Sequence, residues 1–268
     1  MPAPSVAHPT KLADEVTRHA VQSVNDCHAS DDPFPHFTTL ALFPEGFYRE
    51  LVDALPGDEL CTPIGANSSV DGDAACRLRW GTHEDSLALL DADAARLWRA
   101  AREALASEAF RRAVYTKLAG GLALRCGCRP EEVLDKAPGF ALPELYRETR
   151  GYRITPHPDT RKKVVTMQVS LARDASQEHL GTEFYRRNLA PAAWRSEPRG
   201  FDIVKTVPFL PNAASAFVVL NKIGLKSWHG RTALSEQNGV RNSILNIWYA
   251  KAEATHRSGA GTPASYAA

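Results

Sequence analysis

The chain has 268 residues, of which 44% are hydrophobic, so it can bury a sizeable core within one large domain. Its 32 basic and 31 acidic side chains give a formal net charge of +1, which excludes a strong basic field for nucleic acid or a membrane surface and favours a small-molecule partner. Five irregularly spaced cysteines argue against a disulfide framework, so we expect a cytoplasmic protein, either monomeric or homodimeric.

The two ends of the chain differ in composition from the middle. Residues 1–31 are polar and mixed, and residues 252–268 are rich in Gly, Ala, Ser and Thr, which predicts flexible tails around a single domain at 32–251. The N-terminus lacks a basic region followed by an apolar stretch, and no run of eighteen apolar residues occurs. We therefore expect neither a signal peptide nor a membrane span.

Helices are predicted in the first half of the domain, over residues 44–135. A short strand is predicted at 37–43, after which Pro44 opens a helix with apolar residues on one face. From residue 85 to about residue 124, apolar residues recur at helical spacing with a break near Ser107. This pattern predicts a helical pair or one kinked helix.

Strands are predicted in the second half, over residues 140–250. Pro, Gly and Asn signals separate five β-rich runs, at 145–154, 163–171, 202–209, 216–220 and 240–249. No helical pattern intervenes, and parallel neighbours would need a crossover helix, so the strands are expected to be antiparallel. The predicted fold class is α+β, with a mainly β core, either sheet or barrel, braced by the N-terminal helices.

Three residues of the second half are candidate metal ligands. In an extended segment, residues two apart point the same way, so His157 and Asp159 are expected to share a face. His229 is expected to complete that face, with His179 as its rival. Two histidines and a carboxylate are the ligand set of non-haem Fe(II) oxygenases. The alternatives are a polar turn around His157 and a core histidine at position 229.

Arg241 and Ser243 form a second candidate site. They lie two apart at the start of a predicted strand, twelve and fourteen residues after His229, and so share a face. A guanidinium beside a hydroxyl suits a carboxylate in a partly buried pocket. The alternative is a surface arginine at a strand edge, but the position of Arg241 after His229 favours the carboxylate site.

Taken together, His157-Pro158-Asp159, His229 and Arg241-Asn242-Ser243 resemble the motifs of the Fe(II)/2-oxoglutarate-dependent oxygenase superfamily, in its prolyl-hydroxylase-like branch. The resemblance implies a double-stranded β-helix, which is a cupin-like jelly roll. It also implies that His157, Asp159 and His229 hold Fe(II). Arg241 and Ser243 would then bind the far carboxylate of 2-oxoglutarate. Dioxygen is the implied oxidant, with ascorbate as an accessory reductant and succinate and carbon dioxide as products.

The carboxylate at position 159 bears on the reaction type, because related halogenases have a small residue there. Retention of Asp159 favours hydroxylation. The charge of the metal is offset by Asp159 and one co-substrate carboxylate, and the other carboxylate meets Arg241, so the site is expected to be close to neutral. We expect hydroxylation of an unactivated C–H bond of a small polar metabolite, either an amino acid or an intermediate of specialised metabolism. Two alternatives stay open: a hydroxylase of a peptide, protein or carrier-bound residue, and a non-catalytic cupin-like barrel that binds a metal or ligand.

Residues that would contact the substrate are the least defined. Tyr146, Glu148 and Arg150 alternate along a predicted strand, and with Trp228 they are the candidates; the alternative is solvated strand side chains. The segment 186–200 is a candidate lid. A pocket closed by this segment would favour a free metabolite, and a long open groove would favour a peptide.

Overall fold

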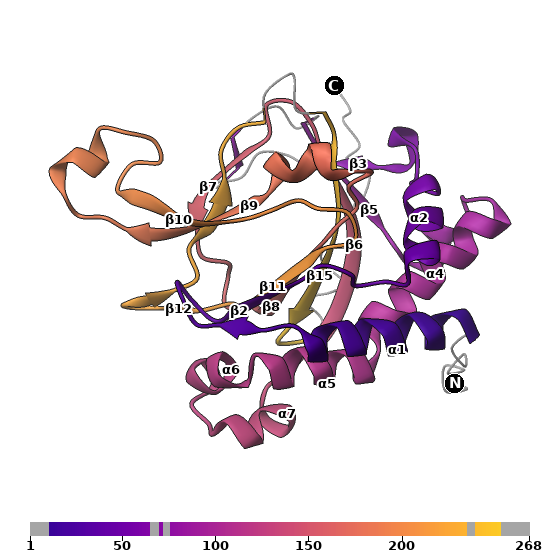
Figure 1. Cartoon of the computed structure of the whole chain (residues 1–268), viewed down its shortest axis with the longest axis horizontal. Helices are drawn as coiled ribbons and strands as arrows, with labels where there is room; N and C mark the ends of the chain where they lie inside the picture. Colours follow the sequence, from indigo (N-terminus) through magenta and orange to yellow (C-terminus); the bar gives the residue numbers. More distant parts are fainter. Residues whose placement is uncertain (1–10, 65–69, 72–75, 235–238, 253–268) are drawn as a thin grey trace, which may run out of the picture.

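Two antiparallel sheets form the core of the computed structural model, which describes residues 11–64, 70–71, 76–234 and 239–252 (Figure 1). The larger sheet has the order β1 (Ala29–Ser30), β2 (His36–Thr39), β11 (Ala214–Val218), β8 (Lys163–Ser170), β15 (Arg241–Tyr249), β6 (Phe140–Glu148), β5 (Arg77–Gly81) and β3 (Thr62–Pro63). The smaller sheet has the order β10 (Phe201–Val207), β9 (Thr182–Arg187), β14 (His229–Arg231), β7 (Arg153–His157) and β4 (Val70–Asp71). A separate hairpin joins β12 (Asn221–Lys222) to β13 (Leu225–Lys226).

The chain passes repeatedly between the two sheets. It runs from β6 in the larger sheet to β7 in the smaller sheet, returns to β8, crosses to β9 and β10, returns to β11, and then crosses to β14 and back to β15. As a result, β15 pairs with both β6 and β8, although about a hundred residues separate β15 from β6. The antiparallel, mainly β core predicted from the sequence is confirmed.

The predicted strand at 145–154 is wrong in one respect, because the structure divides it between the two sheets. β6 ends at Glu148, and β7 begins at Arg153. Gly151 lies in the turn with a φ of 83°, a backbone conformation that side chains with a Cβ rarely adopt. This turn carries the chain from one sheet to the other, so side-chain alternation does not continue from β6 into β7.

The helices gather against the larger sheet, and the smaller sheet lies on its other side (Figure 1). They are α1 (Lys11–Asp26), α2 (Glu45–Asp53), α3 (Glu84–Leu87), α4 (Ala92–Ala106), α5 (Glu108–Lys117), α6 (Ala119–Cys126) and α7 (Val133–Lys136), with short 3₁₀ turns at Asp58–Leu60 and Pro130–Glu132. The predicted break falls at Ser107, whose hydroxyl accepts a hydrogen bond from the Phe110 N–H at 3.2 Å and so begins α5. None of the described helices combines the length and apolar composition needed to cross a membrane.

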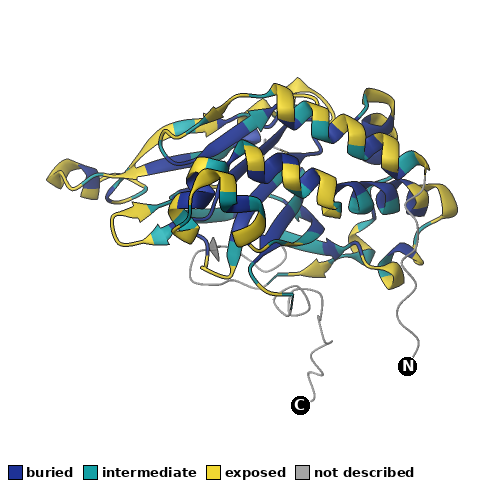
Figure 2. Ribbon diagram, turned by 90° about the horizontal axis from the view of Figure 1, so that it is seen from below, coloured by how far each residue is buried: buried dark blue, intermediate teal, exposed yellow. Residues whose placement is uncertain are grey.

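Aromatic side chains join the helices to the larger sheet. Trp248 of β15 is fully buried, and its ring centroid lies 6.1 Å from those of Phe110 and Tyr115 on α5. Trp98 of α4 packs edge-to-face on Trp80 of β5 at 5.1 Å. Figure 2 shows buried residues where helices meet strands and exposed residues on the outer sides of the helices. These contacts pack the helices onto one face of the larger sheet.

The expected flexible tail at residues 1–31 is corrected, because residues 11–26 form α1 and pack against α4 and α5. One face of α1 is buried, through Ala13, Val16, Ala20 and Val24. Only four small apolar residues make this stripe, so the polar composition of the segment concealed it. Residues 1–10, and residues 253–268 of the expected C-terminal tail, lie outside the described residues.

Candidate metal centre

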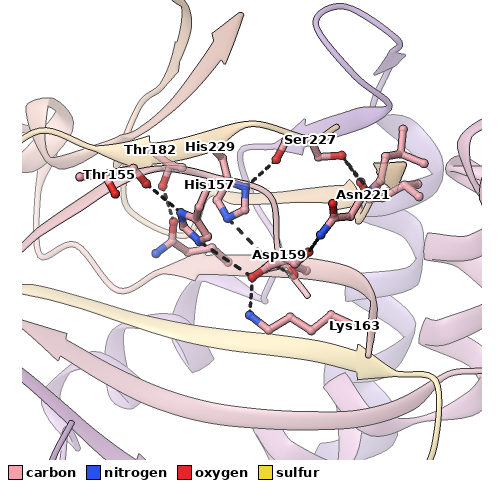
Figure 3. A network of polar contacts seen from close by, with 12 residues as sticks. Thr155, His157, Asp159, Lys163, Thr182, Asn221, Ser227 and His229 are labelled. Atoms are coloured by element: carbon pink, nitrogen blue, oxygen red, sulfur yellow. Dashed lines mark hydrogen bonds and ion pairs between the residues drawn. The ribbon is translucent and has the colours of Figure 1, made fainter. Parts of the chain in front are cut away.

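The three predicted ligands converge between the two sheets (Figure 3). One potential ligand atom from each of His157, Asp159 and His229 lies within 4.8 Å of the other two. The histidines are direct partners across β7 and β14, and their ring centroids are 4.4 Å apart. Asp159 follows β7, with its carboxylate oxygens 4.0 Å from Nε2 of His157 and 3.8 Å from Nε2 of His229.

Gly230 allows the two histidine-bearing strands to approach this closely. A Cβ atom at this position would lie 2.6 Å from the carbonyl oxygen of Ile154 on β7, which is closer than real Cβ contacts. A residue with a side chain would therefore push β14 away from β7. Glycine directly after His229 keeps the two imidazoles on neighbouring strands within reach of one ion.

Backbone carbonyls fix the orientation of both imidazoles. Nδ1 of His157 lies 2.9 Å from the carbonyl oxygen of Thr155, and Nδ1 of His229 lies 2.9 Å from that of Ser227. A carbonyl only accepts, so each Nδ1 carries the proton and donates it. Each Nε2 then keeps its lone pair, which is the arrangement found in histidines that ligate metals.

The protonation states of the three groups suit a cation. Burial lowers the pKa of His157, and burial together with His157 lowers the pKa of His229 to about 3, so both rings are neutral at physiological pH. Burial alone would raise the pKa of Asp159, but Lys163 and the two imidazoles hold it below its usual value. Two neutral imidazoles and one carboxylate fit a divalent first-row metal ion.

Two side chains of β8 hold the carboxylate of Asp159. Nζ of Lys163 lies 2.6 Å from Oδ1, and the Thr166 hydroxyl donates to Oδ2 at 2.6 Å. The side-chain amide of Asn221 donates to the backbone carbonyl of Asp159 at 3.0 Å. We did not predict Lys163 or Thr166, because they lie three residues apart on β8 and regular strand alternation would place them on opposite faces.

The rival third ligand, His179, is exposed in a 3₁₀ turn (Ala175–Leu180) and lies outside the cluster. Its backbone carbonyl accepts from Nη2 of Arg231 at 3.4 Å. The structure therefore brings His229, and not His179, to the other two candidate ligands.

A cavity of about 350 Å³ lies beside the three ligands. Arg241 is in its wall, and protein groups already hold its guanidinium: Nε donates to the Leu180 carbonyl at 2.7 Å, Nη1 donates to Glu148, and Nη2 donates to Gln168 at 2.7 Å and Thr182 at 2.9 Å. Four of its five N–H groups are thus engaged by described residues, so in this arrangement Arg241 cannot hold a ligand carboxylate through two parallel hydrogen bonds. One N–H on Nη1 and a fixed positive charge remain.

Ser243 is fully buried and is not among the described residues of the cavity wall. Its hydroxyl accepts a hydrogen bond from Nε2 of Gln168 at 3.1 Å. The carbonyl oxygen of Gln168 in turn accepts from Thr182 at 2.7 Å and from Arg241. Ser243 therefore orients Gln168, and Gln168 and Thr182 are site residues that the sequence analysis missed.

Of the four candidate substrate residues, only Glu148 lies in the cavity wall, and it is paired with Arg241 and Arg77. Arg150 is exposed in the turn after β6, because the strand ends before it. Trp228 precedes His229 and so points the other way, where its ring packs on Phe201 at 4.9 Å. Neither side chain contributes to the described wall.

Tyr146 is buried outside the cavity wall. Its hydroxyl donates to Glu144 at 3.2 Å, and its ring lies 4.8 Å from the guanidinium of Arg77. Tyr146 therefore supports Arg77, which is itself in the wall. This is a structural role in place of the expected contact with a substrate.

The segment 186–200 is not a lid on this cavity. It connects β9 to β10 through a 3₁₀ turn (Pro191–Trp194) and projects away from the body of the molecule (orange, Figure 1). None of the described wall residues comes from it. The two long strands pair with each other beyond the rest of the sheet, so the hairpin extends outward.

The charge of the cavity differs from the nearly neutral site expected from the sequence. Its described wall contains two carboxylates and four cationic side chains: Glu148, Asp159, Arg77, Lys163, Arg231 and Arg241. Burial and the nearby charge of Arg241 lower the pKa of Arg231 to about 10, so Arg231 stays charged at pH 7. Arg77 is distant in sequence from the metal motifs, and Arg231 lies outside every predicted strand. The sequence therefore did not reveal the excess positive charge.

Comparisons with known proteins give no match by family model and none among curated sequences. Similar solved structures include a Pseudomonas putida prolyl-4-hydroxylase, with 11% identity, a TM-score of 0.47, and coverage of 90% of this chain and 100% of that one. A dioxygenase for auxin oxidation from Arabidopsis thaliana in complex with 2-oxoglutarate has 12% identity, a TM-score of 0.45 and coverage of 78% of each chain. A non-haem α-ketoglutarate-dependent carbocyclase from nogalamycin biosynthesis has 13% identity, a TM-score of 0.42, and coverage of 95% and 94%. At these scores, any functional assignment rests on the site itself.

Proposed function

We propose that the chain is an Fe(II)/2-oxoglutarate-dependent dioxygenase that hydroxylates an unactivated C–H bond of a small polar metabolite, with release of succinate and carbon dioxide. One observation carries this proposal: ligand atoms of His157, Asp159 and His229 lie within 4.8 Å of one another beside a cavity. Three ligands from one side of an ion leave its other positions for a co-substrate and dioxygen. The buried neutral imidazoles and the ionised carboxylate match that donor set.

The fold that we propose is a double-stranded β-helix. Four adjacent strands of the larger sheet, β11, β8, β15 and β6, would face four of the smaller sheet, β10, β9, β14 and β7. The repeated passage of the chain between these two groups supports the assignment, since a jelly roll is built in this way. The histidines then belong to the smaller sheet and Arg241 to the larger one. The cavity between them would therefore have a metal side, which carries the histidines, and an arginine side, which carries Arg241 and would bind anions.

Arg241 is the proposed partner for the distal carboxylate of 2-oxoglutarate. Its charge is permanent, it lies in the cavity wall, and Leu180, Gln168 and Thr182 fix the plane of its guanidinium. Ser243 contributes by orienting Gln168. A fixed guanidinium loses little conformational entropy on binding. This favours affinity for a carboxylate even though only one N–H of Arg241 is available to it.

Bound iron would supply the chemistry of dioxygen activation and one-electron transfer. The residues of this chain hold the metal ligands in position. Thr155 and Ser227 hold the two imidazoles through their carbonyls, while Lys163 and Thr166 hold the carboxylate of Asp159. The apolar side chains of the wall, Phe217 and Leu245 among them, limit the entry of water around the reacting groups.

The test is the stoichiometric conversion of 2-oxoglutarate to succinate by the Fe(II)-loaded protein in air, combined with a mass-spectrometric screen for products that gain one oxygen atom. We expect succinate formation that depends on added iron, and one or more metabolites with the added mass. Intact metal binding without succinate formation across the screen would instead support a non-catalytic, cupin-like binding barrel.

A second candidate substrate is a residue on a peptide or a carrier protein. It is favoured by one observation: the segment 186–200, which would close the pocket over a free metabolite, projects away from the cavity and exposes Leu189 and Trp194. The same screen distinguishes the two, since a free metabolite gains oxygen in the absence of any protein partner. Oxygen incorporation only into peptides would support the second candidate.

A further inference from the structure

Three charged side chains form a row across the inner face of the larger sheet. Glu148 on β6 lies directly opposite Arg77 on β5 and directly opposite Arg241 on β15. Oε1 of Glu148 lies 3.2 Å from Nε of Arg77, and Oε2 accepts a hydrogen bond from Arg241. One carboxylate is therefore shared between two guanidinium groups, and it compensates the charge of only one.

The uncompensated charge persists when the site is filled as proposed. Four cationic and two anionic side chains give the described wall a charge of +2. A divalent metal adds two positive charges, and doubly ionised 2-oxoglutarate removes the same number. An excess of about two positive charges in a partly enclosed cavity is costly unless an anion enters. After the metal and 2-oxoglutarate are bound, the substrate is the molecule that can supply this anion.

Arg77 is the cation best placed to receive that anion. Its side chain is 13% exposed at the cavity, and its buried Nε forms an ion pair with Glu148 but has no hydrogen-bond partner among the described residues. The guanidinium stacks over the rings of Tyr146 at 4.8 Å and Tyr152 at 5.1 Å, which hold it in place. Arg77 lines the same cavity as the three metal ligands.

The other cations are committed elsewhere. Lys163 is paired with Asp159 at 2.6 Å. Arg231 also has a buried Nε without a hydrogen-bond partner among the described residues, but both of its Nη atoms donate to backbone carbonyls, those of Gly181 and His179. These carbonyls flank the Leu180 carbonyl that holds Arg241, so Arg231 lies beside the proposed co-substrate position. Arg77 stands on the opposite side of Glu148 from Arg241.

We propose that the substrate carries an oxyanion, a carboxylate or a phosphate, which Arg77 binds while Glu148 positions its guanidinium. This inference rests on the proposed function and narrows its substrate class from a polar to an anionic molecule. A planar guanidinium matches both oxyanions, whereas a neutral amide of the same shape lacks the charge.

The test uses the full chain loaded with Mn(II), in place of redox-active iron, and saturated with 2-oxoglutarate. Isothermal titration compares three probes of similar shape: benzoate, benzamide and phenyl phosphate. We expect benzoate or phenyl phosphate to bind about 10- to 100-fold more tightly than benzamide, as the loss of a charge-assisted hydrogen bond implies. Whichever anion binds more tightly identifies the oxyanion.

Three variants assign the effect to Arg77. Arg77→Gln should abolish the preference for the anion and leave the affinity for 2-oxoglutarate within about twofold, and Arg77→Lys should retain part of the preference. Arg79→Gln is the matched control, because Arg79 lies two residues along the same strand but outside the described wall, near Glu144. It should bind all probes as the unmodified chain does.

Two kinds of failure are distinguishable. Equal affinity for benzoate, phenyl phosphate and benzamide, no binding of any of them, or an anion preference that survives in Arg77→Gln would overturn this inference while 2-oxoglutarate binding stands. Absence of 2-oxoglutarate binding to the Mn(II)-loaded chain would overturn the proposed function itself.

Discussion

The two sides of the cavity use charge in opposite ways. The metal side, on β7 and β14, presents two neutral imidazoles and one carboxylate, and each imidazole is held by a carbonyl only two residues earlier in the chain. The arginine side, on β5, β6 and β15, presents two permanent cations around one carboxylate, and the Arg241–Glu148 pair joins residues 93 positions apart. A cation is therefore expected on the first side and anions on the second.

The largest expected effect concerns the metal side. His229→Ala removes one of three ligands and should reduce metal affinity by at least about 100-fold, because the remaining two donors cannot hold a divalent ion against water. Isothermal titration with Mn(II) measures this change. The matched control is His179→Ala, because His179 is exposed and lies outside the ligand cluster. This variant should bind Mn(II) as the unmodified chain does. The opposite result for the two variants would reverse the choice of ligand.

The next effect concerns the arginine side. Glu148→Gln leaves two neighbouring buried guanidinium groups without their shared carboxylate, so we expect a loss of roughly 3 kcal/mol in the free energy of unfolding, measured by urea denaturation. Glu84→Gln removes an equally double-paired but exposed carboxylate, next to Arg99 and Arg102, and should cost less than about 1 kcal/mol. Equal losses in the two variants would contradict the description of the row as a buried ion network.

A smaller effect separates the two sides from each other. Arg241→Gln should weaken 2-oxoglutarate binding about 10- to 100-fold, because a carboxylate loses its charged partner. Its Mn(II) affinity, measured without 2-oxoglutarate, should change by less than about threefold, since the described hydrogen bonds of Arg241 go to residues other than the three metal ligands. A parallel loss of Mn(II) affinity would show that the two sides are one coupled unit.

The smallest effect is a pH dependence that only the metal side should show. The folded pKa of His229, about 3, lies below the ordinary value of 6.5, so the unfolded chain binds more protons as the pH falls through that window. Stability of the metal-free protein is fully present above about pH 6.5 and is lost progressively below it. Between pH 7 and pH 6 we expect His229 to lower the free energy of unfolding by roughly 0.7 kcal/mol, measured by urea denaturation. The decrease should be smaller in His229→Gln, and an unchanged decrease would contradict the assignment to this residue.

The metal side could be predicted from the sequence because its determinants are local. The spacing of His157 and Asp159 gave a shared direction, and His229 was preferred to His179 because Arg241-Asn242-Ser243 follows it in the chain. The structure adds that Gly230 lets β14 approach β7. The break between two helices at Ser107 was also predictable from local residues.

On the arginine side, Arg241 and Glu148 were candidates separately, but their row with Arg77 could not be predicted, because it depends on strand register. Arg77, Glu148 and Arg241 become neighbours only when β5 and β15 pair with β6, and one sequence does not display that pairing. Arg150 was assigned to the same face by alternation, which failed because the strand ends at Glu148. Helix α1 was missed because its buried stripe consists of four small residues in a polar segment.

The most direct test of the central claim is an anaerobic titration of the metal-free chain with Fe(II) and then 2-oxoglutarate, followed by visible absorption. We predict a charge-transfer band that appears only when both are present, saturates at one equivalent of each, and is lost in His229→Ala while it persists in His179→Ala. A spectrum that stays unchanged after 2-oxoglutarate is added to the Fe(II)-loaded chain would contradict the account.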